Sequence, residues 1–592
     1  MAVQFIFGGS GRGKTYFLQH KIMEEAVNNP KKDYIMIVPE QFTMQTQKDM
    51  IKISPGHGIM NIDVQSFVRL AFRVFSETGA GNLPVLDDLG KIMILKKVLG
   101  QKKDELKYFG RNINKDGYIS EIKSFMSELI QYGADEDEIE RMIKASEKKP
   151  VLKYKLQDMS VAFKSFKEYI EKNYITSEEL LSVFADVVSQ SELLKGAVIC
   201  LDGFTGFTPL QYRLLRELIK TAEMVYVTVT ADDRESVINK GKNYQLFFMS
   251  RKTVHNIRQI ASETGVEVLD DIWTGKEIIQ TRFGESEELE WLERNLFRYP
   301  YKRYNKKNEV SDISCHVLKY AEDEVDFVVQ KIKGLLVGGC RYRDIAIVAG
   351  SLETYGSIIE HSMKKAGIAC FVDQKRGVQS SVPVRAIDAL LQIIIKDFAY
   401  EDVMDYLKSC LSWTSDSQND ILDNYLLATG IRGFKSWNRE WNTAYAYRRM
   451  TDESKDFANG VVENVRLGVL ENLSELYEKT AKGKHTVREY AASLFEFFER
   501  QHFYEKLMEF ADEYEENENF DMASEYRQLY GMVIEVFEKL VSLMGDEKMS
   551  LKEFKDILDV GFSEARIGVI PPGIDQVMAG DMSRTRISNI KY

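Results

Sequence analysis

Short apolar runs alternate with helical patterns at the start of the chain. The stretch VQFIFGGSGRGKTYFLQHKIMEEAVNN (3–29) begins with an apolar run, passes through a glycine-rich turn and continues with helical spacing of its apolar residues. DYIMIVPEQ (33–41) is a second apolar run, and NIDVQSFVRLAFRVF (61–75) is typical of a strand followed by a helix. Continuous apolar runs between helices are typical of parallel strands buried on both faces. The pattern therefore predicts a doubly wound parallel sheet.

The strand pattern is interrupted and then resumes. Helical spacing predominates from about Asp87 to Ser191, and the apolar runs GAVICLDGF (196–204) and AEMVYVTVTADD (222–233) follow, each leading into an aspartate. Because strands of one sheet flank the helical stretch, we interpret it as an insertion into an α/β unit.

A second unit repeats this plan. The polar, basic stretch RYPYKRYNKKNEV (298–310) is turn-like and indicates a boundary. Beyond it, ISCHVLKYA (313–321), DIAIVAG (344–350) and GIACFVD (367–373) are predicted strands, and the chain is helical again from about Tyr400 to Leu558. The acidic run FADEYEENENFD in that stretch is typical of a solvated helix face or loop.

The predicted fold class is α/β, with two RecA-like parallel-sheet P-loop units, each carrying a large helical insertion. The second unit is expected to be incomplete at its C-terminal side. The predicted domains are a first RecA-like domain at 1–80 plus 192–297, a helical insertion at 81–191, a second RecA-like domain at 298–398 plus 560–592, and a second helical insertion at 399–559.

Composition excludes several classes of protein. Apolar residues make up 44% of the 592 residues, which is ordinary for a globular protein, and the net charge of −12 means that any nucleic-acid binding has to use local clusters. The five cysteines are widely spaced without a C-x-x-C pair, which argues against a disulfide framework or a zinc ribbon and favours a reducing cytoplasm. We expect no signal peptide and no membrane span.

The strongest motif is a phosphate-binding loop. G-x-x-x-x-G-K-T lies between an apolar strand and a helix, as this loop requires, and its residues are Gly8, Gly9, Ser10, Gly11, Arg12, Gly13, Lys14 and Thr15. The glycines let backbone N–H groups approach phosphate oxygens, and the helix start contributes its positive dipole end. Lys14 is expected to reach the β- and γ-phosphates of ATP and Thr15 to hold Mg²⁺.

A hydrolytic P-loop site also needs an acidic pair at a neighbouring strand end. Asp202 ends the apolar run of VICLDGF and is the candidate for orienting Mg²⁺, although a helix cap or turn role is the alternative. The next residue is Gly203, which cannot act as a general base to activate water. The sequence therefore predicts nucleotide binding with weak or absent hydrolysis, and no catalytic residue is assigned.

Two aromatic and basic clusters leave their roles open. KSWNREWNTAYAYRRM (435–450) interleaves Trp, Tyr and Arg as single-strand binders do, yet Trp437, Trp441 and Ala444 recur at helical spacing, which favours a core face. YPYKRYNKK (299–307) is either a phosphate contact or, as we favour, a solvated linker.

Several stretches together resemble one family. The phosphate loop, IMIVPEQFTMQTQ (35–47), NIDVQSFVRLAFRVF (61–75), LDGFTGFTPLQ (201–211) and IPPGIDQVMAGDMSRTR (570–586) follow the order of a superfamily 1, UvrD-like helicase core. More closely, the chain resembles the N-terminal, helicase-like part of B subunits of AddAB (RexAB) helicase–nucleases. The resemblance implies a heterodimer with an ATP-driven A subunit, double-strand-break repair and recombination in the cytoplasm, and contact with single- and double-stranded DNA.

The resemblance also implies where DNA binds. In such proteins the helicase-like part scans the exiting single strand for the Chi sequence, and the loops after the second and third strands contact it. The corresponding candidates are Gln41, Thr43, Phe67, Arg69 and Phe72, and Phe207, after the strand that ends at Asp202, is a further stacking candidate. Amide, hydroxyl and guanidinium groups can bond to bases or phosphates, and phenylalanines can stack on bases. Phe67 and Phe72 as core residues, and Gln41 as a helix-start residue, are the alternatives.

Three classes of function remain open at this point. The first is a nucleotide-binding DNA-recognition part, without the 5′→3′ exonuclease domain and its iron–sulfur cluster, which the resemblance places in a C-terminal half missing here. The second is an active superfamily 1 DNA-dependent ATPase or helicase, and Gly203 argues against it. The third is a protein-interaction scaffold with a relic loop.

Overall fold

The structure is a computed structural model of the whole chain. It describes residues 1–56, 58, 61–80, 83–110, 116–171, 173–234, 236–237, 241–275, 282–283, 286–304, 310–409, 412–441, 451–568, 575–583, 585 and 590–592.

The larger sheet is entirely parallel and contains the strand that leads into the phosphate loop. Its order is β3-β2-β6-β7-β1-β8, with β9 also paired to β1. The strands are β1 (Ala2–Gly8), β2 (Tyr34–Ile37), β3 (Ile62–Gln65), β6 (Val198–Leu201), β7 (Met224–Thr230), β8 (Glu267–Val268) and β9 (Ile272–Trp273). Because parallel strands end at one edge, the residues that follow β1, β2, β3 and β6 lie at that same edge.

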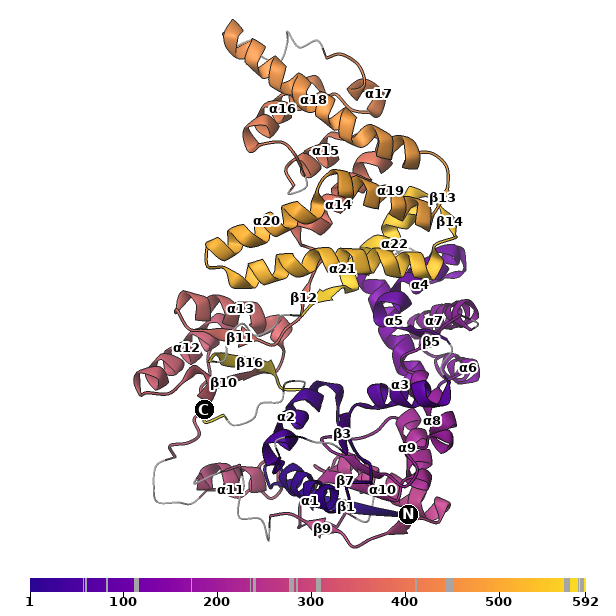
Figure 1. Ribbon diagram of the computed structural model, residues 1–592, viewed down its shortest axis with the longest axis vertical. Coiled ribbons are helices and arrows are strands. Elements are labelled where there is room, and N and C mark those ends of the chain that lie inside the picture. The colour runs from indigo at the N-terminus through magenta and orange to yellow at the C-terminus, as the bar shows by residue number, and fades with distance from the viewer. Residues whose placement is uncertain are drawn as a thin grey trace.

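Helices cover both faces of this sheet (Figure 1). In β1, Phe5 and Phe7 face a core with α3, α8, α9 and α10, while Ile6 faces a separate core with α1 and α2. This alternation produces two apolar layers from one strand, which explains its continuous apolar sequence. The helices are α1 (Lys14–Asn28), η1 (Glu40–Phe42), α2 (Thr43–Ile53), α3 (Phe67–Thr78), α8 (Leu180–Val187), η3 (Val188–Gln190), α9 (Pro209–Thr221), α10 (Phe248–Thr264) and α11 (Glu287–Asn295).

The predicted helical stretch between β3 and β6 forms its own group of helices (Figure 1). It contains α4 (Asp88–Gln101), η2 (Lys103–Glu105), α5 (Asp116–Gln131), α6 (Glu136–Ala145) and α7 (Pro150–Ile170), with the parallel pair β4 (Val85–Leu86) and β5 (Ile175–Thr176). Buried Asp158 on α7 accepts hydrogen bonds from the backbone N–H groups of Lys107, Tyr108 and Phe109, and so ties the loop after α4 to α7.

The second sheet is small and parallel, with the order β10-β16-β11. It consists of β10 (Ala346–Ala349), β11 (Cys370–Val372) and β16 (Val577–Asp581), accompanied by α12 (Ala321–Val337), η4 (Tyr342–Asp344) and α13 (Leu352–Lys365). The central strand β16 comes from a stretch more than 200 residues after β11, because the second helical group lies between them.

One predicted strand of the second unit is wrong. ISCHVLKYA has no strand; residues 313–318 are irregular and α12 begins at Ala321. Val317 is 93% exposed. None of the described strands pairs with this segment, so its apolar residues have no ladder to join.

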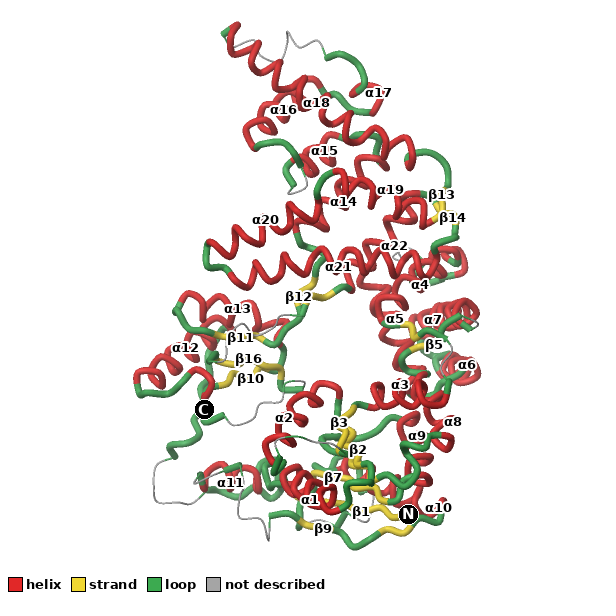
Figure 2. Tube along the Cα trace, viewed as in Figure 1, coloured by secondary structure: helices red, strands yellow, loops and turns green. Residues whose placement is uncertain are grey.

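The second helical group joins the first through α4 (Figure 2). Gly561 of α22 packs closely against Met93 of α4, where an added Cβ would collide with the methionine. The group comprises α14 (Val382–Ile395), α15 (Tyr400–Leu407), α16 (Asp416–Thr429), α17 (Phe434–Trp437), α18 (Asp452–Thr480), α19 (Val487–Arg500), α20 (Phe503–Glu516), α21 (Phe520–Met544) and α22 (Leu551–Glu564). Two antiparallel pairs accompany it, β12 (Arg376–Gly377) with β15 (Arg566–Ile567) and β13 (His485–Thr486) with β14 (Lys548–Met549).

The α/β class with RecA-like units and helical insertions is thus confirmed. The exact domain boundaries stay predictions. Among the described helices, none combines the length and the apolarity that crossing a membrane would require.

Candidate functional site

The phosphate loop has the backbone that its sequence requires. It begins at Gly8, the last residue of β1, and ends where α1 starts at Lys14. Gly11 and Gly13 have φ values of 71° and 81°, a region that L-residues with side chains rarely adopt. Gly13 is the N-cap of α1, so the helix dipole is directed at the loop.

Thr15 and Asp202 meet although they lie far apart in the sequence. The Thr15 hydroxyl donates to the Asp202 carboxylate, with Oγ1 at 3.1 and 3.0 Å from its two oxygens. Thr228 of β7, the strand between β1 and β6, donates to Asp202 Oδ1 at 2.6 Å. Asp202 is 1% exposed, and its carboxylate and the Thr15 hydroxyl are oxygen donors of the kind that Mg²⁺ prefers.

Lys14 folds back over the loop. Its Nζ donates to the Gly9 carbonyl oxygen at 2.8 Å. Burial lowers the pKa of Lys14 to about 8, although the nearby carboxylates of Asp202 and Glu293 raise it. An ammonium group that is partly desolvated in this way gains from an anionic ligand, because a phosphate would restore the stabilisation of its charge.

Gly203 has a conformation that favours glycine. It follows Asp202 with φ at 80°, and it is exposed. A glutamate at this position would be strained by the left-handed backbone. The backbone at this position therefore disfavours the glutamate that a hydrolytic site would place there.

Helix α11 covers the loop from the side, a contact that we did not expect from the sequence. Arg12 Nη1 lies 2.7 Å from Glu290 Oε1, and Arg12 Nη2 lies 3.2 Å from Glu293 Oε2. A Cβ added to Gly9 would collide with Glu293 Oε1, so this carboxylate packs directly against the loop. Only the acidic face of EELEWLERN could have indicated the contact, because Arg12 and Glu293 are separated by 281 residues.

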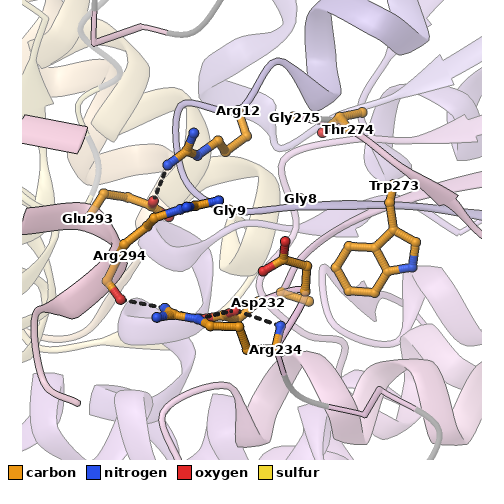
Figure 3. Close-up of a pocket in the computed structure, with 12 residues that line it drawn as sticks. Gly8, Gly9, Arg12, Asp232, Arg234, Trp273, Thr274, Gly275, Glu293 and Arg294 are labelled. Carbon is orange, nitrogen blue, oxygen red and sulfur yellow. Dashed lines mark hydrogen bonds and ion pairs between the residues drawn. The ribbon is translucent and has the colours of Figure 1, made fainter. Parts of the chain in front are cut away.

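A small cavity borders one side of the loop (Figure 3). A cavity of about 40 Å³ lies between the loop, α11 and the ends of β7 and β9. It is lined on the β7 side by Asp232 and Arg234 and on the β9 side by Trp273. Burial raises the pKa of Asp232, but the hydrogen bonds from Arg234 and the charge of Arg298 lower it to about 2. Arg12 and Glu293 lie on its wall, so the ion pair between the loop and α11 borders this cavity.

The predicted DNA-contacting segments are mostly helical rather than loops. Gln41 is exposed in the short helix η1, and Thr43 begins α2. Thr43 is 4% exposed and donates to the Glu40 carbonyl at 3.0 Å, so its hydroxyl has a local role. Arg69 on α3 is exposed, and its Nε lies 2.8 Å from Glu40 Oε1, which joins the segments after β2 and β3.

The three candidate phenylalanines differ in exposure. Phe67 is 6% exposed and packs against Phe204 and Phe207, with ring centroids 5.4 and 6.3 Å away. This supports the core alternative for Phe67. Phe207 is half-buried, whereas Phe72 is 49% exposed on α3 and has a face available for stacking.

The aromatic clusters at 435–450 and 299–307 differ in their burial. Trp437 is 1% exposed and packs against Phe398 and Trp441, which favours the core interpretation, and Ala444 lies outside the described residues. Tyr299 and Tyr301 are 98% and 70% exposed, as expected for a solvated linker. In the described parts of the chain no cluster of His, Cys, Asp or Glu side chains could hold a metal ion by itself.

Fold and site together define a P-loop α/β protein with RecA-like units and helical insertions. Residues 5–293 match the family described as "ADDB, N-terminal". The whole chain is 40% identical over 598 residues to the B subunit of the ATP-dependent helicase/deoxyribonuclease of Lachnoclostridium phytofermentans, covering 51% of that protein. It is 32% identical to the proteins of the same name from Acetivibrio thermocellus and Clostridium novyi, covering 51% and 50% of them.

The chain is therefore a homologue of these B subunits, matched along its full length. It spans about half the length of the curated relatives it matches.

Proposed function

We propose that this chain is the nucleotide-binding, helicase-like part of the B subunit of a heterodimeric helicase–nuclease that acts in DNA double-strand-break repair and recombination. The relatives are named as B subunits of ATP-dependent helicase/deoxyribonucleases, which supports the DNA-processing class. Its partners in this proposal are an ATP-driven A subunit and DNA, and it acts in the cytoplasm. The 5′→3′ exonuclease domain and the iron–sulfur cluster belong, in this proposal, to a part of the protein outside the matched region.

The observation that carries the proposal is the contact of Thr15 with Asp202 at the mouth of a phosphate loop. The loop from Gly8 to Thr15 would hold the phosphates of ATP, and Thr15 and Asp202 would hold Mg²⁺, which neutralises phosphate charge when bound. These oxygen donors fit a hard divalent cation, and Lys14 supplies the cation that a phosphate loop needs.

Hydrolysis is expected to be weak in this proposal. Asp202 has the position to orient a cation, but Gly203 provides no carboxylate to activate water. Bound ATP then acts as a structural or signalling ligand and is not hydrolysed to drive movement.

Single-stranded DNA is proposed to cross the edge of the large sheet near α3. Gln41, Arg69 and Phe72 are exposed there on neighbouring segments, and they combine an amide, a guanidinium and an aromatic face. Amide and guanidinium groups can discriminate between bases, whereas the ring would stack on any base. Recognition of Chi by these residues is part of the proposal.

One experiment separates the three classes of function. MgATP binding and ATP turnover are measured on the purified chain and on Lys14→Ala, with and without single-stranded DNA. We expect saturable binding by the wild type, loss of binding in the variant and negligible turnover. Robust DNA-stimulated turnover would show an ATPase or helicase in its own right, and absence of binding would leave a scaffold with a relic loop.

A further inference from the structure

We propose that Glu290 and Glu293 of helix α11 compete with nucleotide phosphates for the phosphate loop, so that nucleotide binding releases α11. The inference rests on the proposed nucleotide binding and concerns the regulation of that same site. In this proposal, the carboxylates of α11 occupy the loop when no nucleotide is bound. The position of α11 then depends on whether nucleotide is bound.

The guanidinium of Arg12 is the group for which the carboxylates and the phosphates would compete. Its side chain is 9% exposed and is paired with Glu293, which is 19% exposed, and with Glu290, which is 45% exposed. The guanidinium also lies over the ring of Phe283, 5.2 Å from the centroid. A cation that is buried to this degree needs an anionic partner, and a phosphate can replace a carboxylate in that role.

The Glu293 carboxylate also lies on the loop itself (Figure 3). Glu293 packs against Gly9, and its charge acts on Lys14. The Arg282 N–H donates to the Gly11 carbonyl at 3.0 Å, which adds a backbone contact to the loop from the segment before α11. Incoming phosphates would meet like charges and occupied donors here, so binding requires Glu293 and Glu290 to leave.

A second set of contacts holds the C-terminal end of α11, directly after Glu293. Arg234, after β7, donates to the Arg294 carbonyl and pairs with Asp232. Arg298, three residues beyond the end of α11, also pairs with Asp232. The C-terminal half of α11 therefore contacts both the phosphate loop and the segment that follows β7.

The place of α11 in the chain gives its release a consequence. It follows the last strand of the large sheet, β9 (272–273), and precedes α12 (321–337) of the second unit. A change at the loop would therefore act on the connection between the two α/β units. Because Gly203 provides no general base for hydrolysis, a bound nucleotide would keep this connection in one position. Repeated movement driven by ATP hydrolysis is not expected.

The principal test is the affinity for MgATP of the double variant Glu290→Gln, Glu293→Gln. Removing both charges takes away the competitor and leaves Arg12 without an anion until phosphate arrives. We expect the dissociation constant to fall about tenfold, the size expected from two partly exposed ion pairs. Glu288→Gln is the matched control: it removes a charge from the same helix, but Glu288 accepts from the N–H groups of Ser311 and Asp312 and does not contact the loop.

Trp291 provides a second readout. It lies on α11 between the two glutamates and packs edge-to-face against Tyr304, with ring centroids 5.4 Å apart. MgATP should change its emission in the wild type, and Trp291→Phe should remove that change. The double glutamine variant should show much of the shifted emission before nucleotide is added, while circular dichroism confirms that it is folded.

The outcomes distinguish this inference from the proposed function. Equal affinities for the wild type and the double variant, with no nucleotide-dependent Trp291 signal, would overturn the competition while leaving nucleotide binding intact. Saturable binding by the wild type, with tighter binding by the double variant, would support both. If neither chain binds MgATP, both are overturned.

Discussion

Proton uptake by Lys14 should accompany nucleotide binding. Burial holds the pKa of this lysine at about 8 in the free chain, against an ordinary value of 10.5. Phosphate oxygens favour the charged ammonium, so bound nucleotide should return the pKa toward its ordinary value. For a full return, linkage gives an uptake of roughly 0.5 proton at pH 8 and roughly 0.9 proton at pH 9.

The same shift sets the pH dependence of affinity. Between pH 7 and pH 9 the association constant should fall about tenfold, because the free chain increasingly carries a neutral lysine that has to be protonated on binding. The pH dependence of folding stability that Lys14 causes has the opposite sign to that of the affinity. A lysine with a lowered pKa opposes folding below pH 8, and this penalty is relieved as the pH rises from about 8 to 10.5. Loss of affinity therefore cannot be attributed to Lys14-driven unfolding.

Isothermal titration calorimetry in two buffers of different ionisation enthalpy measures the proton uptake directly. Measurements at pH 7, 8 and 9 avoid the titration of a terminal phosphate, whose pKa is about 6. Lys14→Arg keeps the charge throughout this range and should flatten the pH dependence. Affinity that stays constant from pH 7 to pH 9, with buffer-independent heats, would refute the assigned role of Lys14.

Three further outcomes are expected. Gly203→Glu should not create DNA-stimulated ATP turnover, and it should destabilise the fold by about 1–2 kcal/mol in urea titration because the backbone there is left-handed. Phe67→Ala should lower stability by about 3–5 kcal/mol, whereas Phe72→Ala should leave stability nearly unchanged and weaken all single strands alike, as oligonucleotide titrations would show. Arg69→Ala should reduce the preference for Chi over scrambled oligonucleotides by about 1–3 kcal/mol at one stated salt concentration, measured on the heterodimer; an unchanged ratio would remove Arg69 from sequence reading.

Local chemistry was enough to predict the phosphate loop. Only glycine readily adopts the positive φ values of Gly11 and Gly13, and the short apolar run that ends in this glycine turn indicates a buried strand, as β1 is. The expectation that Asp202 lies at the site also follows from pattern, since β6 ends immediately before it in a parallel sheet. The two helical groups were predictable for the same reason, because their apolar spacing is repeated over many turns.

Burial and pairing were decided by the tertiary structure. Phe67 and Phe72 both follow a strand in one amphipathic stretch, but the aromatic neighbours Phe204 and Phe207 bury only the first. ISCHVLKYA has the composition of a strand, yet a strand requires a partner, and none of the described strands pairs with it.

Local residue patterns alone establish that there is a phosphate loop and that its neighbouring aspartate lacks a following glutamate. What the loop contacts was determined only by the folded chain. Arg12 meets Glu290 and Glu293 across more than 270 residues, and no periodicity or motif encodes which acidic helix reaches which loop. Such a contact depends on how a helix packs against the end of a sheet, a long-range arrangement that local residue spacing does not specify.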